Sequence, residues 1–121
     1  MICGLGGNDV LKGSAGNDTL LGGAGNDQVL GGKGDDTVDG GSGDDMINGG
    51  YGNDSVLGRK GHDLVYGGRG FDVLAGGFGD DWLADNDGAD YSDSLNGGEG
   101  DNDICTSDSV DSESGCELDG P

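Results

Sequence analysis

A nine-residue pattern recurs without a break in the central part of this chain. Residues 22–57 are four consecutive nonads, and the first of them reads Gly-Gly-Ala-Gly-Asn-Asp-Gln-Val-Leu. All four have glycine at places one, two and four, aspartate at place six and an aliphatic residue at place eight. A repeat this short and regular predicts one small structural unit that stacks on its own copies, because a single unit cannot bury a core by itself. Glycine at this frequency also excludes a helix.

The same register covers nine nonads, from Gly4 to Ala84. Place two is the least regular of the glycine places, since Leu5, Ser14 and Arg59 replace glycine there. We therefore treat residues 1–84 as one region of regular repeats.

Beyond residue 84 the repeat degenerates. Asp93-Ser94-Leu95-Asn96 matches the end of a regular nonad, which predicts a tenth repeat with three residues inserted in its turn. Residues 97–105 align as an eleventh repeat, in which Asn102 stands where aspartate belongs. These degenerate repeats occupy 85–105, and the acidic tail at 106–121 is expected to cap the last coil, which has no further neighbour.

The spacing of the glycines separates a turn from a strand within each nonad. Glycines at places one and four mark backbone that needs positive φ or a close approach. Places seven to nine, such as Thr37-Val38-Asp39, are expected to form a three-residue strand in which only the middle side chain faces inward. Two nonads then make one coil, and like places in successive coils stack about 4.8 Å apart. The predicted fold is all-β, a parallel β-solenoid with a single file of place-eight aliphatic residues from each side as its core.

The composition indicates that burial of this core alone does not stabilise the fold. The chain has 31 glycines among 121 residues, only 31% hydrophobic residues and a net charge of −20, so apolar burial alone should not offset the loss of conformational entropy. A bound cation would supply the missing stability, and regularly spaced carboxylates among exposed backbone carbonyls suit a hard metal ion. Nucleic acid and anionic membrane surfaces are poor partners at this charge. No apolar stretch is long enough to predict a membrane span, and the N-terminus shows no signal peptide.

Calcium is the metal that these ligands favour, because it takes six to eight oxygen ligands from carboxylates and carbonyls. Like turns of successive coils share an edge, so Asp27 should stack against Asp45, and a divalent cation between two such carboxylates would offset their repulsion. Asp72 would pair with either Asp90 or Asp93, and the full set of pairs predicts about seven or eight calcium ions. The candidate carboxylate ligands are Asp9, Asp18, Asp27, Asp36, Asp45, Asp54, Asp63, Asp72, Asp81, Asp90 and Asp93. The candidate backbone carbonyls are those of Gly4, Gly7, Gly13, Gly16, Gly22, Gly25, Gly31, Gly34, Gly40, Gly43, Gly49, Gly52, Gly58, Gly61, Gly67, Gly70, Gly76 and Gly79.

The repeated motif resembles the RTX, or hemolysin-type, calcium-binding repeats, and the resemblance covers about four-fifths of the chain. It implies a right-handed parallel β-roll that is disordered without calcium and folds when calcium binds. It also implies secretion, since such rolls occur in exported toxins, proteases, lipases, adhesins and surface proteins. Magnesium should serve poorly, because it demands a smaller octahedral site and keeps its waters.

No catalytic role is predicted. The sequence has neither His-Glu-x-x-His nor Gly-x-Ser-x-Gly, so the protease and lipase activities of family members have no carrier here, and His62 is interpreted as a turn residue. We expect an extracellular calcium-binding β-roll with a structural or interaction role. Two alternatives stay open: an accessory or secretion domain of a secreted enzyme or toxin whose catalytic part is absent, and a subunit of a self-assembling extracellular filament.

The irregular parts of the chain carry two further predictions. Met46, Leu64, Tyr66 and Trp82 gather apolar groups on one outward face. Either the insert and tail cover them, or they form a docking face for a neighbouring domain or a second copy of the chain.

The second prediction concerns the cysteines. Cys105 and Cys116 bracket a short segment and are expected to form a disulfide that holds the tail. Cys3 is then left over, and its partner is either an upstream residue or another molecule.

Overall fold

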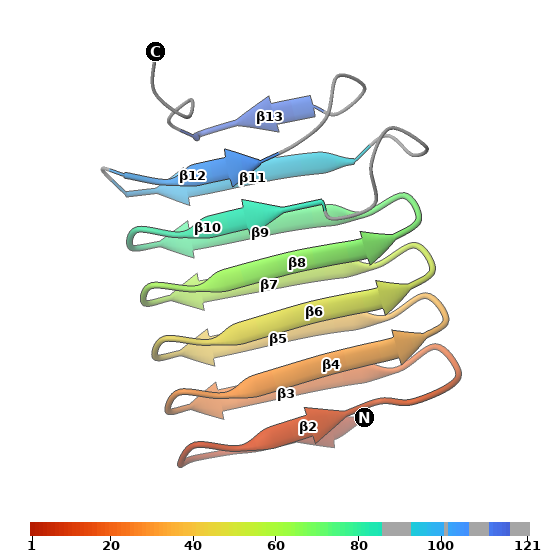
Figure 1. Cartoon of the computed structure of the whole chain (residues 1–121). Helices are drawn as coiled ribbons and strands as arrows, with labels where there is room; N and C mark the ends of the chain where they lie inside the picture. Colours follow the sequence, from red (N-terminus) through yellow and green to blue (C-terminus); the bar gives the residue numbers. More distant parts are fainter. Residues whose placement is uncertain (86–92, 101, 107–111, 117–121) are drawn as a thin grey trace.

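The computed structural model describes residues 1–85, 93–100, 102–106 and 112–116, and these form a two-sheet solenoid (Figure 1). Every strand pairs in parallel with the strand one coil away. One sheet contains, in spatial order, β1 (Ile2–Cys3), β3 (Thr19–Ala24), β5 (Thr37–Ser42), β7 (Ser55–Lys60), β9 (Val73–Phe78), β11 (Ser94–Glu99) and β13 (Ser112–Ser114). The other contains β2 (Val10–Lys12), β4 (Gln28–Lys33), β6 (Met46–Tyr51), β8 (Leu64–Arg69), β10 (Trp82–Ala84) and β12 (Ile104–Thr106). The predicted parallel β-solenoid is confirmed.

The strands are longer than the sequence predicted. In the regular coils they have six residues and run from place seven through place three of the next nonad. The glycine pair that seemed to belong to the turn therefore lies in the sheet, where Gly23 pairs with Gly41 and Ala24 with Ser42. The expectation of three-residue strands was wrong for these coils, because a glycine can extend a ladder wherever the neighbouring coil offers the matching backbone groups. The turn proper is confined to places four to six.

In the nine regular nonads positive φ occurs at places two and four, not at place one; in the tail, Gly115 has a φ of 63°. Gly41 and Gly43 have φ of 94° and 114° and are typical of their places. The three residues that replace glycine at place two, Leu5, Ser14 and Arg59, are the non-glycine residues with positive φ among the described residues, at 73°, 75° and 81°. Because this region costs an L-residue roughly 1–2 kcal/mol, place two is more demanding than its sequence variation indicates.

The core is the predicted single file from each sheet. Its members, between 0% and 6% exposed, are Leu11, Leu20, Val29, Val38, Ile47, Val56, Val65, Leu74, Leu83, Leu95 and Cys105. Only one side chain per nonad enters this core, so the apolar burial is too small to stabilise the coil without another source of free energy.

The tenth repeat has the predicted register, and the eleventh does not. Leu95 pairs with Leu74 in the ladder between β11 and β9, as a three-residue insertion requires. In the ladder between β10 and β12, however, Leu83 pairs with Cys105. Cys105 thus occupies place eight, and Asp103, not Asn102, occupies place six. One extra residue in the turn is tolerated because the strand keeps its pairing and its apolar residue still faces inward.

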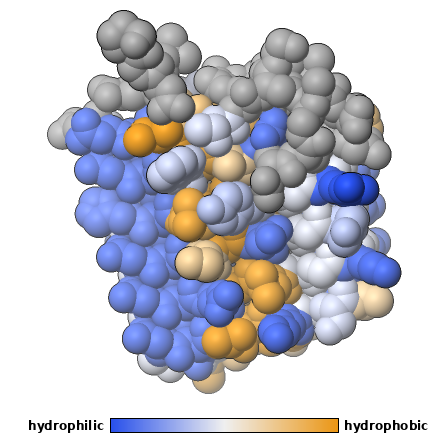
Figure 2. Space-filling model, viewed as in Figure 1, coloured by the Kyte–Doolittle hydropathy of each residue, from blue (hydrophilic) through white to orange (hydrophobic). Residues whose placement is uncertain are grey.

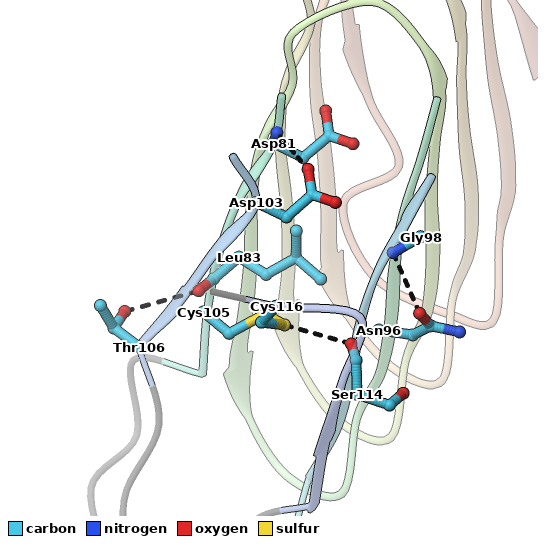
Figure 3. Close-up of a disulfide and its surroundings, with 9 residues drawn as sticks. All are labelled: Asp81, Leu83, Asn96, Gly98, Asp103, Cys105, Thr106, Ser114 and Cys116. Atoms are coloured by element: carbon cyan, nitrogen blue, oxygen red, sulfur yellow. Dashed lines mark hydrogen bonds between the residues drawn. A yellow bond between two sulfur atoms is a disulfide. The ribbon is translucent and has the colours of Figure 1, made fainter. Parts of the chain in front are cut away.

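The C-terminal end of the solenoid is held by a disulfide between Cys105 and Cys116, as predicted. Cys105 lies on β12, and Cys116 follows β13 in the opposite sheet, so the bond joins the two sheets across the end of the core (Figure 3). The two cysteines are 11 residues apart, and closing such a loop contributes on the order of 3 kcal/mol in the chain-entropy model. Cys3 has a free, exposed thiol. The insert at 86–92 and the tail segments at 107–111 and 117–121, to which a covering role was assigned, lie outside the described residues.

Candidate metal centre

The place-six aspartates form two columns, one along each edge of the solenoid. Each aspartate ends the turn that precedes a strand, and successive strands of one sheet are one coil apart, so like turns stack. One column contains Asp9, Asp27, Asp45, Asp63, Asp81 and Asp103, and the other contains Asp18, Asp36, Asp54, Asp72 and Asp93. The two predicted partners of Asp72 are thereby separated: Asp93 stacks on it, and Asp90 lies outside the described residues.

A hydrogen bond joins each aspartate to the next one in its column. The backbone N–H of Asp27 donates to Asp45 Oδ1 at 2.8 Å, and the N–H of Asp45 donates to Asp63 Oδ1 at 2.9 Å. Nine such bonds of 2.8–2.9 Å connect the described coils. In each bonded pair, Oδ1 of the aspartate that comes later in the chain therefore accepts a hydrogen bond from the backbone of the preceding coil.

The second carboxylate oxygen is buried without a hydrogen bond in most of these residues. This holds for Oδ2 of Asp9, Asp18, Asp27, Asp36, Asp45, Asp54, Asp63, Asp81 and Asp103. Burying a carboxylate oxygen without a partner is costly. Its repetition in coil after coil indicates a partner that is not part of the polypeptide.

Each buried Oδ2 lies beside the place-one glycine of its own nonad, where the missing side chain leaves a small space. We call this space, bordered by the glycine, Oδ2 and a carbonyl of the next coil, a cradle. A Cβ atom added to Gly49 would lie 2.6 Å from Asp54 Oδ2 and 2.7 Å from the carbonyl oxygen of Gly67 in the next coil. At Gly58 the corresponding distances, to Asp63 Oδ2 and to the Gly76 carbonyl oxygen, are both 2.6 Å. Place one is thus glycine because of the space it leaves, and each cradle brings a carboxylate oxygen and a backbone carbonyl together.

The place-four carbonyls lie elsewhere in the turn. A Cβ added to Gly25 would contact the carbonyl oxygen of Gly7 in the coil below and would lie 3.1 Å from Asn8 Oδ1. The Gly7 carbonyl and the place-five side chain of Asn8 thus lie side by side under Gly25, and the place-four carbonyls stay predicted ligands.

Place five forms a hydrogen-bond ladder that the sequence reasoning missed. Asn26 N–H donates to Asn8 Oδ1 at 2.8 Å, a bond that runs from the upper coil to the lower one, opposite to the place-six bonds. His62 occupies this ladder as a turn residue, and its Nδ1 accepts the N–H of Asp80 at 3.0 Å. The recurrence of asparagine and aspartate at place five was the available signal.

Asp103 is the second site residue that the sequence reasoning missed. It is 2% exposed, and its Oδ1 accepts the N–H of Asp81 at 2.8 Å. Reading Cys105 as the apolar residue of place eight would have found it, since a free or bridged cysteine packs as a small hydrophobe.

Five of the stacked carboxylates have a raised pKa and therefore resist ionisation. Burial, opposed by the backbone hydrogen bond and reinforced by neighbouring carboxylates, raises the pKa of Asp63 to about 7. The same causes raise the pKa of Asp45, Asp54 and Asp81 to about 6, and that of Asp36 in the same direction. A positive charge in the cradles would reverse this effect, because it favours the ionised form.

The donor set fits a hard cation. Among the described residues, no three His, Cys, Asp or Glu side chains converge on one point, so each cradle offers its carboxylate together with backbone oxygen. Calcium accepts this mixture, whereas zinc prefers nitrogen and sulfur ligands. Within the same described ranges, no helix is long and apolar enough to cross a bilayer.

Comparison with known proteins agrees with this geometry. The model of one protein family, described as RTX calcium-binding nonapeptide repeat (4 copies), matches residues 4–38, 39–74 and 66–91. No match was found among curated proteins or among solved structures.

Proposed function

Because the chain belongs to the family of RTX calcium-binding nonapeptide repeats, we propose that it is an extracellular β-roll that folds when calcium binds. Calcium binding itself follows from the family. The observation that supports calcium-driven folding is the set of buried, unpartnered Oδ2 atoms, each beside a carbonyl of the next coil. Without a cation these atoms oppose folding, and with one they stabilise it.

The stacking of the aspartates supports a proposed number of about nine calcium ions. The nine place-six hydrogen bonds define nine aspartate pairs, and about nine calcium ions would bring a charge of about +18 against the net −20 of the chain. This is slightly more than the seven or eight expected from the sequence, because Asp93 and Asp103 both join the columns.

A calcium titration followed by far-ultraviolet circular dichroism tests this proposal. In chelator at pH 7.5 we expect the spectrum of an unfolded chain, and calcium should produce the strand spectrum in one cooperative step, since ligands that bind only the folded state stabilise it. Magnesium at equal concentration is the control and should leave the chain unfolded. A full strand spectrum in chelator would contradict calcium-driven folding.

The role we propose is not catalytic, and the exposed apolar side chains favour an interaction. Met46, Leu64 and Trp82 are neighbours on successive strands β6, β8 and β10, and Met46 and Trp82 are 47% and 50% exposed. Figure 2 shows a hydrophilic column along the left edge of this face and, beside it, a band in which hydrophobic groups are interspersed with more polar ones. A band of this kind suits a second copy of the chain or a neighbouring domain, as in an assembled filament or an accessory domain of an exported protein.

Serine at positions 64 and 82 tests this surface. We expect the double variant Leu64→Ser, Trp82→Ser to be monomeric in calcium under conditions where the parent chain self-associates, because the apolar area that drives contact is lost. Multi-angle light scattering gives the mass, and Thr19→Ser on the opposite sheet serves as the control. The same mass for parent and double variant at every concentration would remove self-association through this face.

A further inference from the structure

The tail continues the solenoid by half a coil. In the ladder between β11 and β13, Ser112 pairs with Ser94 and Ser114 with Asn96. These positions are places seven and nine of the tenth repeat, so the next tail residue, Gly115, lies over Gly97, which is place one. The tail thus supplies the place-one position of a coil that has no further nonad.

Gly115 completes a cradle of the kind seen lower in the roll. A Cβ added to Gly97 would contact the carbonyl oxygen of Gly115 and would lie 3.0 Å from Asp103 Oδ2. One coil below, a Cβ added to Gly76 would lie 2.5 Å from Asp81 Oδ2 and 2.6 Å from the carbonyl oxygen of Gly97. Both cradles therefore combine a place-one glycine, the carboxylate of its own repeat and a carbonyl from above.

The carboxylate in this last cradle lacks a partner for one oxygen. Asp103 is 2% exposed, its Oδ1 accepts the N–H of Asp81 at 2.8 Å, and its Oδ2 is buried without a hydrogen bond. No further place-six aspartate stacks on Asp103 among the described residues. The Gly115 carbonyl is then the donor that replaces the missing coil.

The backbone ladder does not position Gly115 as it does in a regular coil. Gly68 N–H, at place two, donates to the carbonyl of Asp85 in the coil above at 2.9 Å. The equivalent N–H of Gly98 instead donates to Asn96 Oδ1 at 3.0 Å. The tail has thus lost a hydrogen bond that elsewhere fixes the place-one carbonyl.

The disulfide holds the Gly115 carbonyl in position instead of this hydrogen bond. Cys116 follows Gly115 directly, and its partner Cys105 lies two residues after Asp103. Figure 3 shows Asp103 stacked on Asp81 and, further along the same strand, the disulfide beside Leu83, with Cys116 Sγ 3.2 Å from the carbonyl oxygen of Ser114. One covalent bond therefore ties together the segments that carry the two oxygen donors.

We propose that Asp103 Oδ2 and the Gly115 carbonyl, over Gly97, form a terminal calcium site that exists only while the Cys105–Cys116 disulfide is closed. The site adds to the nine aspartate pairs and rests on the calcium-binding function proposed above. Water would supply the remaining ligands, as calcium sites commonly allow. Opening the bond with a dithiol moves two electrons and two protons to the cysteines, leaves two thiols and turns the dithiol into a cyclic disulfide. The free tail then withdraws the carbonyl.

Counting calcium per chain tests the proposal. Native mass spectrometry of the full chain, titrated with calcium, should show that opening the disulfide lowers the saturated count by about one ion. The double variant Cys105→Ser, Cys116→Ser should show the same lower count with and without dithiol. The control Cys3→Ser should behave as the parent, because its thiol lies outside the bond. An unchanged count when the bond opens would overturn the proposal, and so would a loss of several ions, which would mean that the disulfide stabilises the whole end.

A second variant separates the site from the stability of the tail. Gly97→Ala fills the cradle, and we expect it to lose about one ion while intact mass still shows the closed disulfide. Gly6→Ala is its control, because no atom lies within 4 Å of a Cβ at that position. A full count in Gly97→Ala would overturn the terminal site alone, whereas a chain that binds no calcium in any form would overturn the proposed function.

Discussion

Gly49→Ala is expected to disable calcium-dependent folding at the centre of the roll. The new Cβ would lie 2.6 Å from Asp54 Oδ2, 2.7 Å from the Gly67 carbonyl oxygen and 2.9 Å from Asp54 Cβ. These neighbours are backbone or a short buried side chain, so none can move aside without breaking the ladder. Overpacking of this kind costs about 1–3 kcal/mol, and the lost cation contact adds to it.

The measurement is the calcium midpoint for folding, with the thermal midpoint in saturating calcium as a second readout. We expect a large rise in the calcium midpoint and a fall in the thermal midpoint for Gly49→Ala. Gly6→Ala carries the same substitution at a position where the Cβ meets nothing within 4 Å, so both of its midpoints should stay near those of the parent. Equal midpoints for the two variants would show that the cradle at Gly49 is not a binding site.

Acid should act in opposite directions with and without calcium. Asp45, Asp54 and Asp81 have a pKa of about 6 in the roll and Asp63 one of about 7, against an ordinary value of 3.8. Between about pH 4 and pH 7 these aspartates bind more protons in the folded chain than in the unfolded chain. In chelator the free energy of unfolding of the roll therefore rises as the pH falls. The contribution of these aspartates is complete below about pH 4 and is lost as the pH rises through 6 to 7.

In millimolar calcium the trend should reverse. Protons compete with the cation for the same carboxylates, so the calcium-loaded roll should lose stability as the pH falls through this range. Circular dichroism between pH 4 and pH 8, in chelator and in calcium, measures both trends. Asp63→Asn removes the group with the highest pKa and should weaken the acid effect in chelator above about pH 6. A strand signal in chelator that falls on acidification would contradict the expected uptake of protons on folding.

The parts of the fold that the sequence predicted correctly depend on one repeated unit. The file of apolar residues from Leu11 to Leu83 and the stacking of Asp27 on Asp45 follow from the nonad period alone, because parallel strands place like residues over one another. The disulfide between Cys105 and Cys116 was predicted from a different signal, the short separation of two cysteines at the point where the repeat ends.

The failures arise where the role of a residue depends on its neighbour one coil away. Glycine is required at place two for its positive φ and at place one for the space it leaves. The sequence shows the same residue at both places, so it does not distinguish the two reasons. Strand length was underestimated for the same reason, since the pairing of Gly23 with Gly41 is visible only when the coils are stacked. The register of the last repeat was also misread, because the sequence was aligned with Asn102 in place of aspartate, whereas the pairing of Cys105 with Leu83 requires a one-residue insertion.

The amino-acid sequence by itself therefore determined the period, the parallel two-sheet winding, the inward residue of each nonad and the carboxylate columns, since each of these is a local choice repeated in step. Only the tertiary structure decided which oxygens share a cradle, which residue closes the final repeat and what stands over Gly97. These features depend on contacts between residues 18 to 22 positions apart. In the irregular last coils such contacts cannot be predicted from the nonad period, because the period has ended.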